Sequence, residues 1–127
     1  MAIRALLDAN FLMLPAQMGV DIFGELERLI EEPHELVTSK GVLDELARIA
    51  MGMSEDAPCA KVALKIVDGK KVGIAESSEQ VDEWLVREAE KGGAVVCTND
   101  IALIKRLRRK KVKVIRVLGK SHLGFAD

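Results

Sequence analysis

Short apolar runs separated by polar residues recur along the chain, and each has the length and composition of a β-strand. The runs are rich in β-branched residues and are bounded by turn or helix-capping residues. The pattern predicts five strands, at residues 3–7, 36–38, 72–75, 94–97 and 112–117. The C-terminal sequence GKSHLGFAD shows no pattern that assigns it to a strand or a helix.

Between these strands, apolar residues recur with helical spacing behind residues that commonly start helices. The expected starts and helices are Asp21 for a helix running to about Glu32, Ser39 for 40–51, Pro58 for 59–67, a Ser77–Gln80 capping box for 79–91, and Asn99 for 100–110. Strands that alternate with helices predict an α/β domain whose mainly parallel sheet is covered on both faces. No linker or repeat interrupts the pattern, so residues 1–127 are expected to form one domain.

Composition adds few constraints. No apolar run approaches the roughly 18 residues of a membrane span, and Asp8 comes too early for a secretory signal. A cytoplasmic protein with no membrane contact is therefore expected. Cys59 and Cys97 are isolated from each other and predict buried thiols rather than a disulfide or a zinc site. His34 and His122 have no evident partners and are expected to be solvated loop residues.

Four acids fall where the strands are expected to end. Asp8 ends the first strand, and two residues separate Asp100 from the fourth. Asp82 lies in the first turn or so of the helix after the third strand, and Glu45 in the second turn of the helix after the second. Ligands of such sheets bind beyond the carboxyl ends of the strands, so connectivity alone gathers these four acids at one edge.

Helical phase separates these acids from their neighbours. At about 100° per residue, Glu45 borders the apolar stripe of its helix, whereas Asp44 lies on the far side, four residues before Arg48. On the expected helix at 79–91, Asp82 falls inside the apolar stripe, whereas Glu83 points out towards Arg87. An acid within an apolar stripe needs a physical reason.

A cluster of carboxylates is most simply explained by a hard cation, because without one the charges repel and raise one another's pKa values. Oxygen ligands without nearby His or Cys favour Mg²⁺ or Mn²⁺. Beside these acids stand three polar residues: Asn10 and Thr98, which could support the acids, and Asn99, the expected helix cap. Such an ion is suited to orienting water at a phosphodiester bond.

The segments LLDANFLM, VLDELARIA, VDEWLVREA and VVCTNDIAL together resemble the PIN-domain ribonucleases in order and approximate spacing. The resemblance covers nearly the whole chain and implies an α/β/α sandwich with a parallel sheet of about five strands. It also implies that Asp8, Glu45, Asp82 and Asp100 form the acidic metal-binding quartet. Single-stranded RNA is the implied substrate. RNA processing, as of ribosomal RNA, and a toxin role with a protein inhibitor both stay open, and a homodimer is expected.

Charge is distributed unevenly along the chain. Residues 1 to 104 hold 10 Lys or Arg and 19 Asp or Glu, whereas residues 105 to 127 hold 9 and 1. The basic end is either a solvated face with a protected edge strand or a surface for RNA phosphates. The candidate RNA-binding residues are Lys105, Arg106, Arg108, Arg109, Lys110 and Lys111.

These observations favour a Mg²⁺- or Mn²⁺-dependent endoribonuclease. Two alternatives come from other classes. The first is a catalytically inactive PIN-like module that binds RNA or a partner protein, which would bind RNA regardless of EDTA. The second is a phospho-acceptor receiver domain, which would need paired acids after the first strand, where LLDAN offers one.

Overall fold

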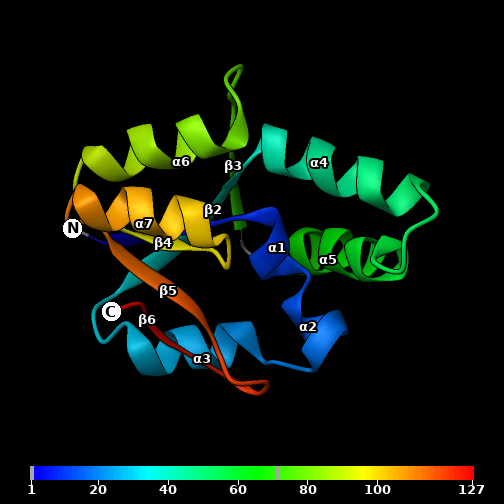
Figure 1. The fold of residues 1–127 in the computed structure, drawn as a ribbon, viewed down its shortest axis with the longest axis horizontal. Coiled ribbons are helices and arrows are strands. Elements are labelled where there is room, and N and C mark those ends of the chain that lie inside the picture. The colour runs from blue at the N-terminus through cyan, green and yellow to red at the C-terminus, as the bar shows by residue number, and fades with distance from the viewer. Residues whose placement is uncertain (1, 71) are drawn as a thin grey trace.

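A computed structural model describes residues 2–70 and 72–127, and within them the chain forms six strands and seven helices (Figure 1). The strands are β1 (Ile3–Leu7), β2 (His34–Ser39), β3 (Val72–Ala75), β4 (Ala94–Cys97), β5 (Lys113–Leu118) and β6 (His122–Phe125). The helices are α1 (Ala9–Leu12), α2 (Leu14–Met18), α3 (Ile22–Leu29), α4 (Lys40–Met51), α5 (Ala57–Gly69), α6 (Val81–Glu90) and α7 (Ile101–Arg109). The short helices α1 and α2 were not predicted from the sequence.

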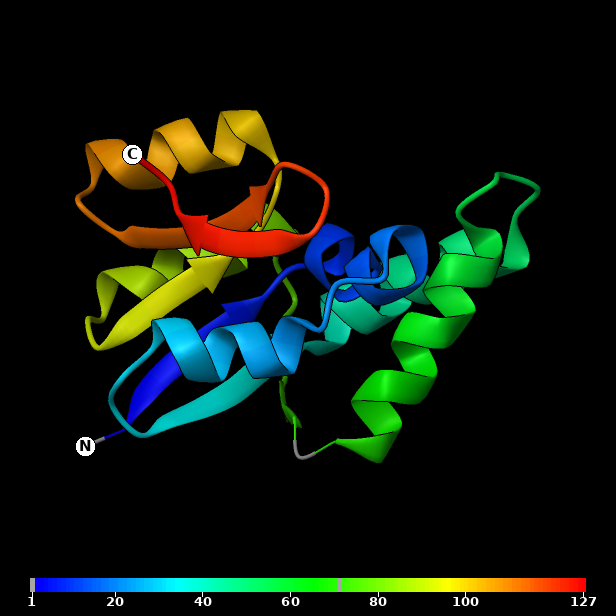
Figure 2. The same cartoon turned by 90° about the horizontal axis from the view of Figure 1, so that it is seen from below.

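All six strands belong to one sheet with the order β3-β2-β1-β4-β5-β6, and Figure 2 shows β5, β4, β1 and β2 side by side. The first five strands are parallel, as predicted, and β6 pairs antiparallel with β5. The expectation of about five strands therefore missed β6, which lies in the tail that had no assignment. Its four residues, HLGF, are too few to show an alternating pattern.

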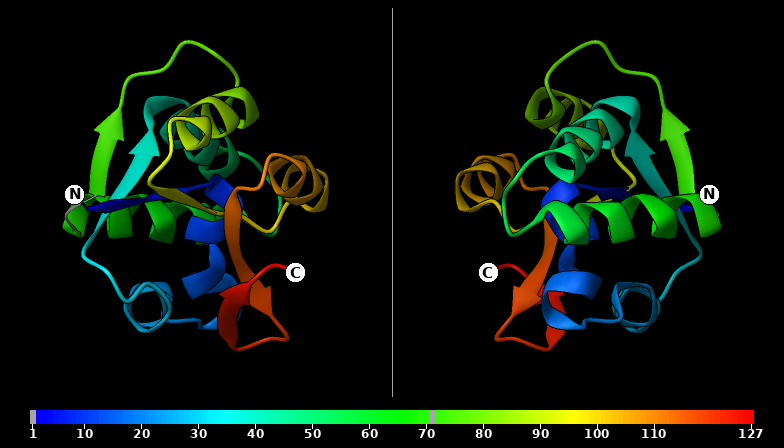
Figure 3. Two further views of the ribbon diagram at one scale, coloured as in Figure 1. Left: turned by 90° about the vertical axis from the view of Figure 1, so that its left-hand side faces the viewer. Right: turned by 90° about the vertical axis from the view of Figure 1, so that its right-hand side faces the viewer.

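Helices cover both faces of the sheet and build two hydrophobic clusters. On one face, Leu6 and Val96 pack with Trp84 of α6 and Leu107 of α7. On the other face, strand residues such as Leu7, Cys97 and Ile115 pack with residues of α1 to α5. Figure 3 shows α6 and α7 on the opposite side of the sheet from α3 and α5. The predicted three-layer α/β/α sandwich is confirmed.

Several local expectations were wrong. The helix begun by Asp21 ends at Leu29 rather than near Glu32, because Ile30 is extended and Pro33 leads into β2. The Ser77–Gln80 capping box does not form: Gln80 itself precedes the first turn of α6, and the Ser77 hydroxyl has no hydrogen-bond partner. His34 is a strand residue with a side chain only 7% exposed, and exposed His122 also lies in a strand.

Other expectations were confirmed. Ser39 caps α4, with its hydroxyl oxygen 3.1 Å from the Val42 nitrogen that donates to it. Both cysteines are free, although Cys59 is only partly buried; burial strongly raises the pKa of the Cys97 thiol. Among the described residues, no helix is both long enough and apolar enough to cross a bilayer.

Helix α3 holds the edge strand β6 through two charged side chains. The backbone N–H of Leu123 donates to Glu25 over 2.9 Å, and the carbonyl of Leu123 accepts from Arg28 over 3.0 Å. Arg28 also donates twice to Glu25, at 3.1 Å each. The Arg28 hydrogen bonds, followed by that from Leu123, lower the pKa of Glu25 from 4.5 to about 2. The outward backbone N–H and carbonyl of Leu123 in β6 are therefore satisfied by α3.

Replacing Glu25 with Gln should lower stability only where the carboxylate is charged. A depressed pKa stabilises the fold above the unfolded value of 4.5, and this contribution is lost as the pH falls towards about 2. Urea unfolding of the parent and Glu25→Gln should therefore differ most at pH 5 to 7, differ less at pH 3 and converge as the pH approaches 2. A difference that stays constant across this range would show that the charge is not what holds β6.

Candidate functional site

The strand order reverses direction between β1 and β4, and the acidic site lies at this switch point. Chain segments leave β1 towards β2 on one side, whereas β4 continues to β5 on the other. Leu7 is in register with Cys97 at the carboxyl ends of the two strands, and the N–H of Asp8 donates to the Cys97 carbonyl over 3.0 Å. In open α/β sheets this crevice is the usual ligand site.

Asp8 is buried, with only 5% of its surface exposed. One carboxylate oxygen accepts from the N–H of Ala9 over 2.8 Å, and the other accepts from the Thr98 hydroxyl over 2.7 Å and from the Asn10 amide over 3.3 Å. Burial raises the pKa of Asp8, the Thr98 and Ala9 hydrogen bonds lower it, and the charges of Asp82 and Asp100 raise it further. Thr98 thus holds Asp8 rather than the Asp100 side chain; its contact with Asp100 is to the backbone N–H, at 3.2 Å.

The two asparagines fix the loop that follows β4. The side-chain oxygen of Asn10 accepts from the N–H of Asn99 over 2.9 Å, and the side-chain oxygen of Asn99 accepts from the N–H of Val117 over 2.9 Å. Asn99 is therefore not the helix cap that the sequence predicted. Asp100 caps α7 instead, since its Oδ1 accepts from the N–H of Leu103 over 3.1 Å. Through these hydrogen bonds, Asn10 and Asn99 link the segments that follow β1 and β4 to each other and to β5.

Glu45 and Asp82 reach the same edge from α4 and α6. Burial raises the pKa of Glu45; the charge of Asp8 raises it further, that of Arg48 lowers it, and that of Asp82 raises it. Partial desolvation of its carboxylate raises the pKa of Asp82, although the residue as a whole is exposed; the charge of Asp100 raises the pKa further, and that of Arg106 lowers it. The structure thus brings all four predicted acids close enough for their charges to act on one another.

The surroundings of these two acids differ in part from the predictions. Asp82 is exposed rather than enclosed in the apolar stripe of α6. Glu83 pairs with Arg106, at 2.7 and 2.9 Å, rather than with Arg87. Arg48, expected to pair with Asp44, instead acts on Glu45, three residues before it on α4. That spacing places both on one helix face, a signal that sequence reasoning could have used.

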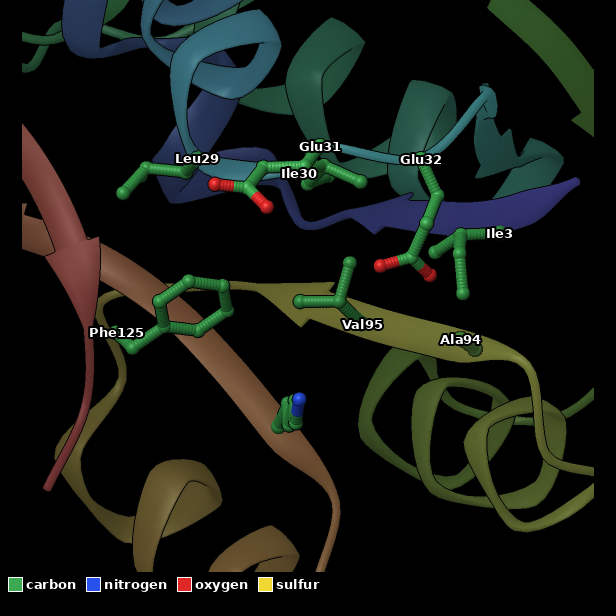
Figure 4. A pocket seen from close by; sticks show the side chains of 9 residues that line it. Ile3, Leu29, Ile30, Glu31, Glu32, Ala94, Val95 and Phe125 are labelled. Carbon is green, nitrogen blue, oxygen red and sulfur yellow. The ribbon is translucent and has the colours of Figure 1, made fainter.

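A groove of ≈ 530 Å³ adjoins this edge, between the start of α4 and the start of α6. Glu45 and Asp82 both line it, together with Arg48, Ser77 and Gln80. A second pocket, of ≈ 240 Å³, lies at the other edge of the sheet, beside the amino ends of β1 and β4 (Figure 4). Its walls carry Phe125, Val95 and Glu32, and it includes none of the four acids.

The six candidate RNA-binding residues follow α7 away from the acidic edge. Lys110 and Lys111 line a groove with Ile3 and Ala94, at the amino ends of β1 and β4. Arg106 is held by Glu83, and Lys110 lies 3.6 Å from Glu90. Lys105, Arg108 and Arg109 are exposed. The basic residues therefore extend from near Asp82 to the opposite edge of the sheet.

A sequence model of the PIN-like domain family matches residues 5–120, which includes all four acids and their supporting residues. The chain belongs to the PIN-like domain family. The resemblance seen in the sequence is thereby confirmed. No curated protein sequence matches the chain significantly.

Two solved structures show the same PIN fold at low sequence identity. The structure of the PIN domain endonuclease Utp24 is 20% identical, with a TM-score of 0.78, and the match covers 96% of this chain and 90% of that one. The structure of VapBC-1 from nontypeable Haemophilus influenzae is 15% identical, with a TM-score of 0.60, covering 88% of this chain and 96% of that one. At these identities the likeness establishes the fold.

The donor set of this PIN-like domain suits a hard cation. The four side chains offer only oxygen, and among the described residues Arg48 and Arg106 are the cations whose charges partly offset the repulsion around Glu45 and Asp82. Within residues 2–70 and 72–127, no three His, Cys, Asp or Glu side chains converge closely enough to hold an ion together. Mg²⁺ commonly binds through one or two carboxylates and several waters, so three direct protein ligands are not required.

If the four acids repel one another, removing one charge should not destabilise the metal-free protein. Glu45→Gln should leave stability in EDTA at pH 7 unchanged or raise it by up to roughly 1 kcal/mol, because solvent screens a half-buried group. A raised carboxyl pKa costs stability only where the pH exceeds the usual value of 4.5, so any gain in Glu45→Gln should disappear below that pH. Thermal melts in EDTA measure this.

Asp44→Asn is the matched control, since Asp44 lies beside Glu45 on α4 but is exposed and outside the cluster. It should change stability little at any pH. A clear loss of stability in Glu45→Gln at pH 7, with Asp44→Asn unaffected, would mean that Glu45 makes a stabilising contact and does not belong to a repulsive cluster.

Proposed function

We propose that this PIN-like domain is a Mg²⁺- or Mn²⁺-dependent endoribonuclease that cleaves single-stranded RNA. The observation that supports it best is the gathering of Asp8, Glu45, Asp82 and Asp100 at the switch point of the sheet, where burial and, after it, mutual repulsion raise the pKa values of the first three. Functional sites are where perturbed carboxylates concentrate. Family membership and the likeness to an endonuclease structure agree with this assignment.

Each acid would have a distinct part in holding the ion. Asp8 and Asp100 are fixed in position by hydrogen bonds at the ends of β1 and β4, and would be the rigid ligands. Glu45 and Asp82 make no hydrogen bond to other described side chains and would complete the site from α4 and α6. The bound ion supplies positive charge that activates water and stabilises the departing oxygen of the phosphodiester.

Basic side chains would place the RNA relative to this site. Arg48 is the cation whose charge acts on Glu45, and it lines the groove beside the acids. The α7 residues would contact phosphates farther along the RNA, because a nine-residue helix is about 13 Å long. With three Phe, one Trp and no Tyr, base stacking can contribute little. We therefore expect weak sequence preference.

The biological role within this activity is also a proposal. RNA processing and a toxin role with a protein inhibitor are both compatible with a cation-dependent PIN-like ribonuclease. The two structural neighbours, the PIN domain endonuclease Utp24 and VapBC-1, share the fold and do not decide between these roles. A catalytically inactive RNA- or partner-binding module is the competing function, and it would bind RNA equally in EDTA.

Asp100→Asn tests the catalytic assignment without disturbing the helix cap. Asn caps helices as well as Asp does, so the variant should fold normally but lose a charged ligand. Several kcal/mol of transition-state stabilisation depend on a bound ion, so cleavage of single-stranded RNA in Mn²⁺ should fall by roughly 100-fold or more. The parent should lose activity in excess EDTA.

Asp21→Asn provides the control, because Asp21 caps α3 with the same 3.1 Å geometry as Asp100 caps α7. It should keep parental activity. Cleavage by the parent in EDTA, or full activity of Asp100→Asn, would contradict the proposal. RNA binding without any cleavage in Mn²⁺ would favour the inactive module.

The α7 surface gives a separate prediction about RNA binding. Replacing both Arg108 and Arg109 with Ala should weaken binding and flatten its dependence on salt, since each lost phosphate contact removes roughly 0.7 from the slope for single strands. The control is Lys61→Ala with Lys65→Ala, two exposed cations on α5. Fluorescence anisotropy over a salt series measures the slopes. Equal slopes in the parent and the α7 variant would mean that these arginines are only a solvated face.

A further inference from the structure

Among the candidate RNA-binding residues, Arg106 differs from the others in its place between α6 and α7. These helices lie side by side on one face of the sheet (Figure 1), where Trp84 of α6 and Leu107 of α7 belong to the same hydrophobic cluster. The Arg106 side chain reaches across from α7 to Glu83 of α6, and Glu83 directly follows Asp82 in the chain. The guanidinium is therefore held beside the acidic edge of the sheet.

The charge of Arg106 acts on the acidic site itself. It lowers the pKa of Asp82, and the charge of Asp82 in turn raises the pKa of Arg106. None of the other candidate RNA-binding residues is among the groups whose charges shift the pKa values of Asp8, Glu45 and Asp82. Within the part of the chain that the structure describes, Arg106 is thus the basic residue of α7 that the acids sense.

The hydrogen bonds to Glu83 occupy only one end of the guanidinium. Nη1 of Arg106 donates to Oε1 over 2.7 Å, and Nη2 donates to Oε2 over 2.9 Å. A guanidinium carries further N–H groups in a fixed planar fork, and among the described residues no acceptor bonds Nε of Arg106. The Nε–H and the outer N–H of Nη2 can therefore bind a phosphate while Glu83 stays in place.

Arg28 shows the contrasting case of an arginine whose donors serve the fold. Its Nε and Nη2 both donate to Glu25, at 3.1 Å each, and Nη2 also donates to the Leu123 carbonyl over 3.0 Å. The Nε side of that guanidinium is thus already occupied. In Arg106 the same pair of donors remains available for a ligand.

The Arg106–Glu83 pair is too exposed to contribute much to stability. The side chain of Arg106 is 38% exposed and that of Glu83 is 56% exposed. Solvent screens the attraction in such a pair, and holding two long side chains in one geometry costs conformational entropy. A bidentate pair nevertheless fixes the plane and direction of the guanidinium. Its main effect is therefore on orientation rather than on stability.

We propose that Arg106 is a catalytic residue that binds the phosphate being cleaved, and that Glu83 is the residue that positions it. This inference rests on the proposed ribonuclease function. The Nε side of Arg106 would donate to the non-bridging oxygens of that phosphate and stabilise their charge in the transition state. Water adds across the P–O bond in the net reaction, and Arg106 keeps its protons throughout.

Arg106 would thus be the exception among the basic residues of α7. Arg108 and Arg109 are exposed and would bind phosphates farther along the RNA, so they would contribute to binding but not to the chemical step. An interaction made only in the transition state raises kcat, whereas one made equally with bound substrate lowers KM. The two kinds of arginine can therefore be told apart by kinetics.

Cleavage of single-stranded RNA in Mn²⁺ tests both assignments. Arg106→Ala should lower kcat by roughly 100-fold, as expected for one lost transition-state donor. Arg106→Lys keeps the charge but loses the fork, and it should lower kcat while KM stays near the parental value. Glu83→Ala should lower kcat by about 10-fold through lost orientation, without raising KM, because it also removes a negative charge near the RNA. Circular dichroism checks that each variant is folded.

The matched control is Arg87→Ala, which removes an arginine of α6 that is 51% exposed together with its 2.7 Å ion pair to Glu79. It should keep the parental kcat and KM, because it lies outside the site. The exchanged pair, Glu83→Arg with Arg106→Glu, should restore an ion pair between α6 and α7 but should not restore kcat.

Thermal melts with and without Mn²⁺ give a readout that does not depend on cleavage. Removing a positive charge beside Asp82 cannot weaken the attraction for a cation. Mn²⁺ should therefore raise the Tm of Arg106→Ala at least as much as that of the parent. A smaller Mn²⁺-induced shift in Arg106→Ala would mean that the variant loses activity by losing the ion, and would overturn the inference.

Several kinetic results would overturn this inference while leaving the proposed function intact: a parental kcat in Arg106→Ala, a kcat in Glu83→Ala that equals or exceeds that of the parent, or recovery of kcat in the exchanged pair. An equal loss of kcat in Arg87→Ala would do the same, because any ion pair on this surface would then suffice. A parent that cleaves no RNA in Mn²⁺ would instead contradict the proposed function, and this inference with it.

Discussion

A buried carboxylate at the junction of β1 and β4 determines how the acidic edge is built. Asp8 is 5% exposed, and burying a charge costs free energy unless hydrogen bonds compensate for it. The N–H of Ala9 and the hydroxyl of Thr98 provide these bonds. The same hydroxyl oxygen accepts from the backbone N–H of Asp100. One short network thus sets the positions of two acids that lie 92 residues apart in the chain.

The four acids lower the stability of the metal-free protein and at the same time create a site that a cation would stabilise. Hydrogen bonds stabilise the charge on Asp8 only in part, because burial and, to a smaller extent, the charges of Asp82 and Asp100 oppose it. Arg48 and Arg106 offset the repulsion around Glu45 and Asp82, but Arg106 is also held by Glu83. A divalent ion would remove the remaining repulsion directly, and binding only to the folded state would raise stability by mass action.

Strands and connectivity could be predicted from the sequence because the central strands are buried on both faces and form continuous apolar runs. β1 and β4 were predicted with their exact bounds on this ground, and the edge strand β3 was predicted with its exact bounds from a short β-rich run between turn residues. The gathering of the acids at one edge followed from connectivity alone. In contrast, β6 could not be predicted, since it is stabilised by side chains of α3 that lie about 95 residues earlier in the chain.

The errors within the site have a common physical origin. Asn99 and Asp100 are both good helix caps by residue type. Asn99 does not cap α7 because its side-chain oxygen accepts a hydrogen bond from the N–H of Val117 in β5. Similarly, Glu83 and Arg87 have helical spacing, but Arg106 on the neighbouring helix offers Glu83 two hydrogen bonds. Local patterns give the candidates, and tertiary contacts choose between them.

The central claim is that a divalent cation binds at the switch point, and nuclear magnetic resonance with Mn²⁺ tests it most directly. Paramagnetic broadening falls steeply with distance, so substoichiometric Mn²⁺ should first broaden the amide signals of Ala9, Asn99 and Asp100, together with those at the start of α6. Excess Mg²⁺ should restore these signals by competition. Spectra that show no selective broadening, or broadening confined to other acids such as Glu31 and Glu32 at the opposite edge, would contradict the account.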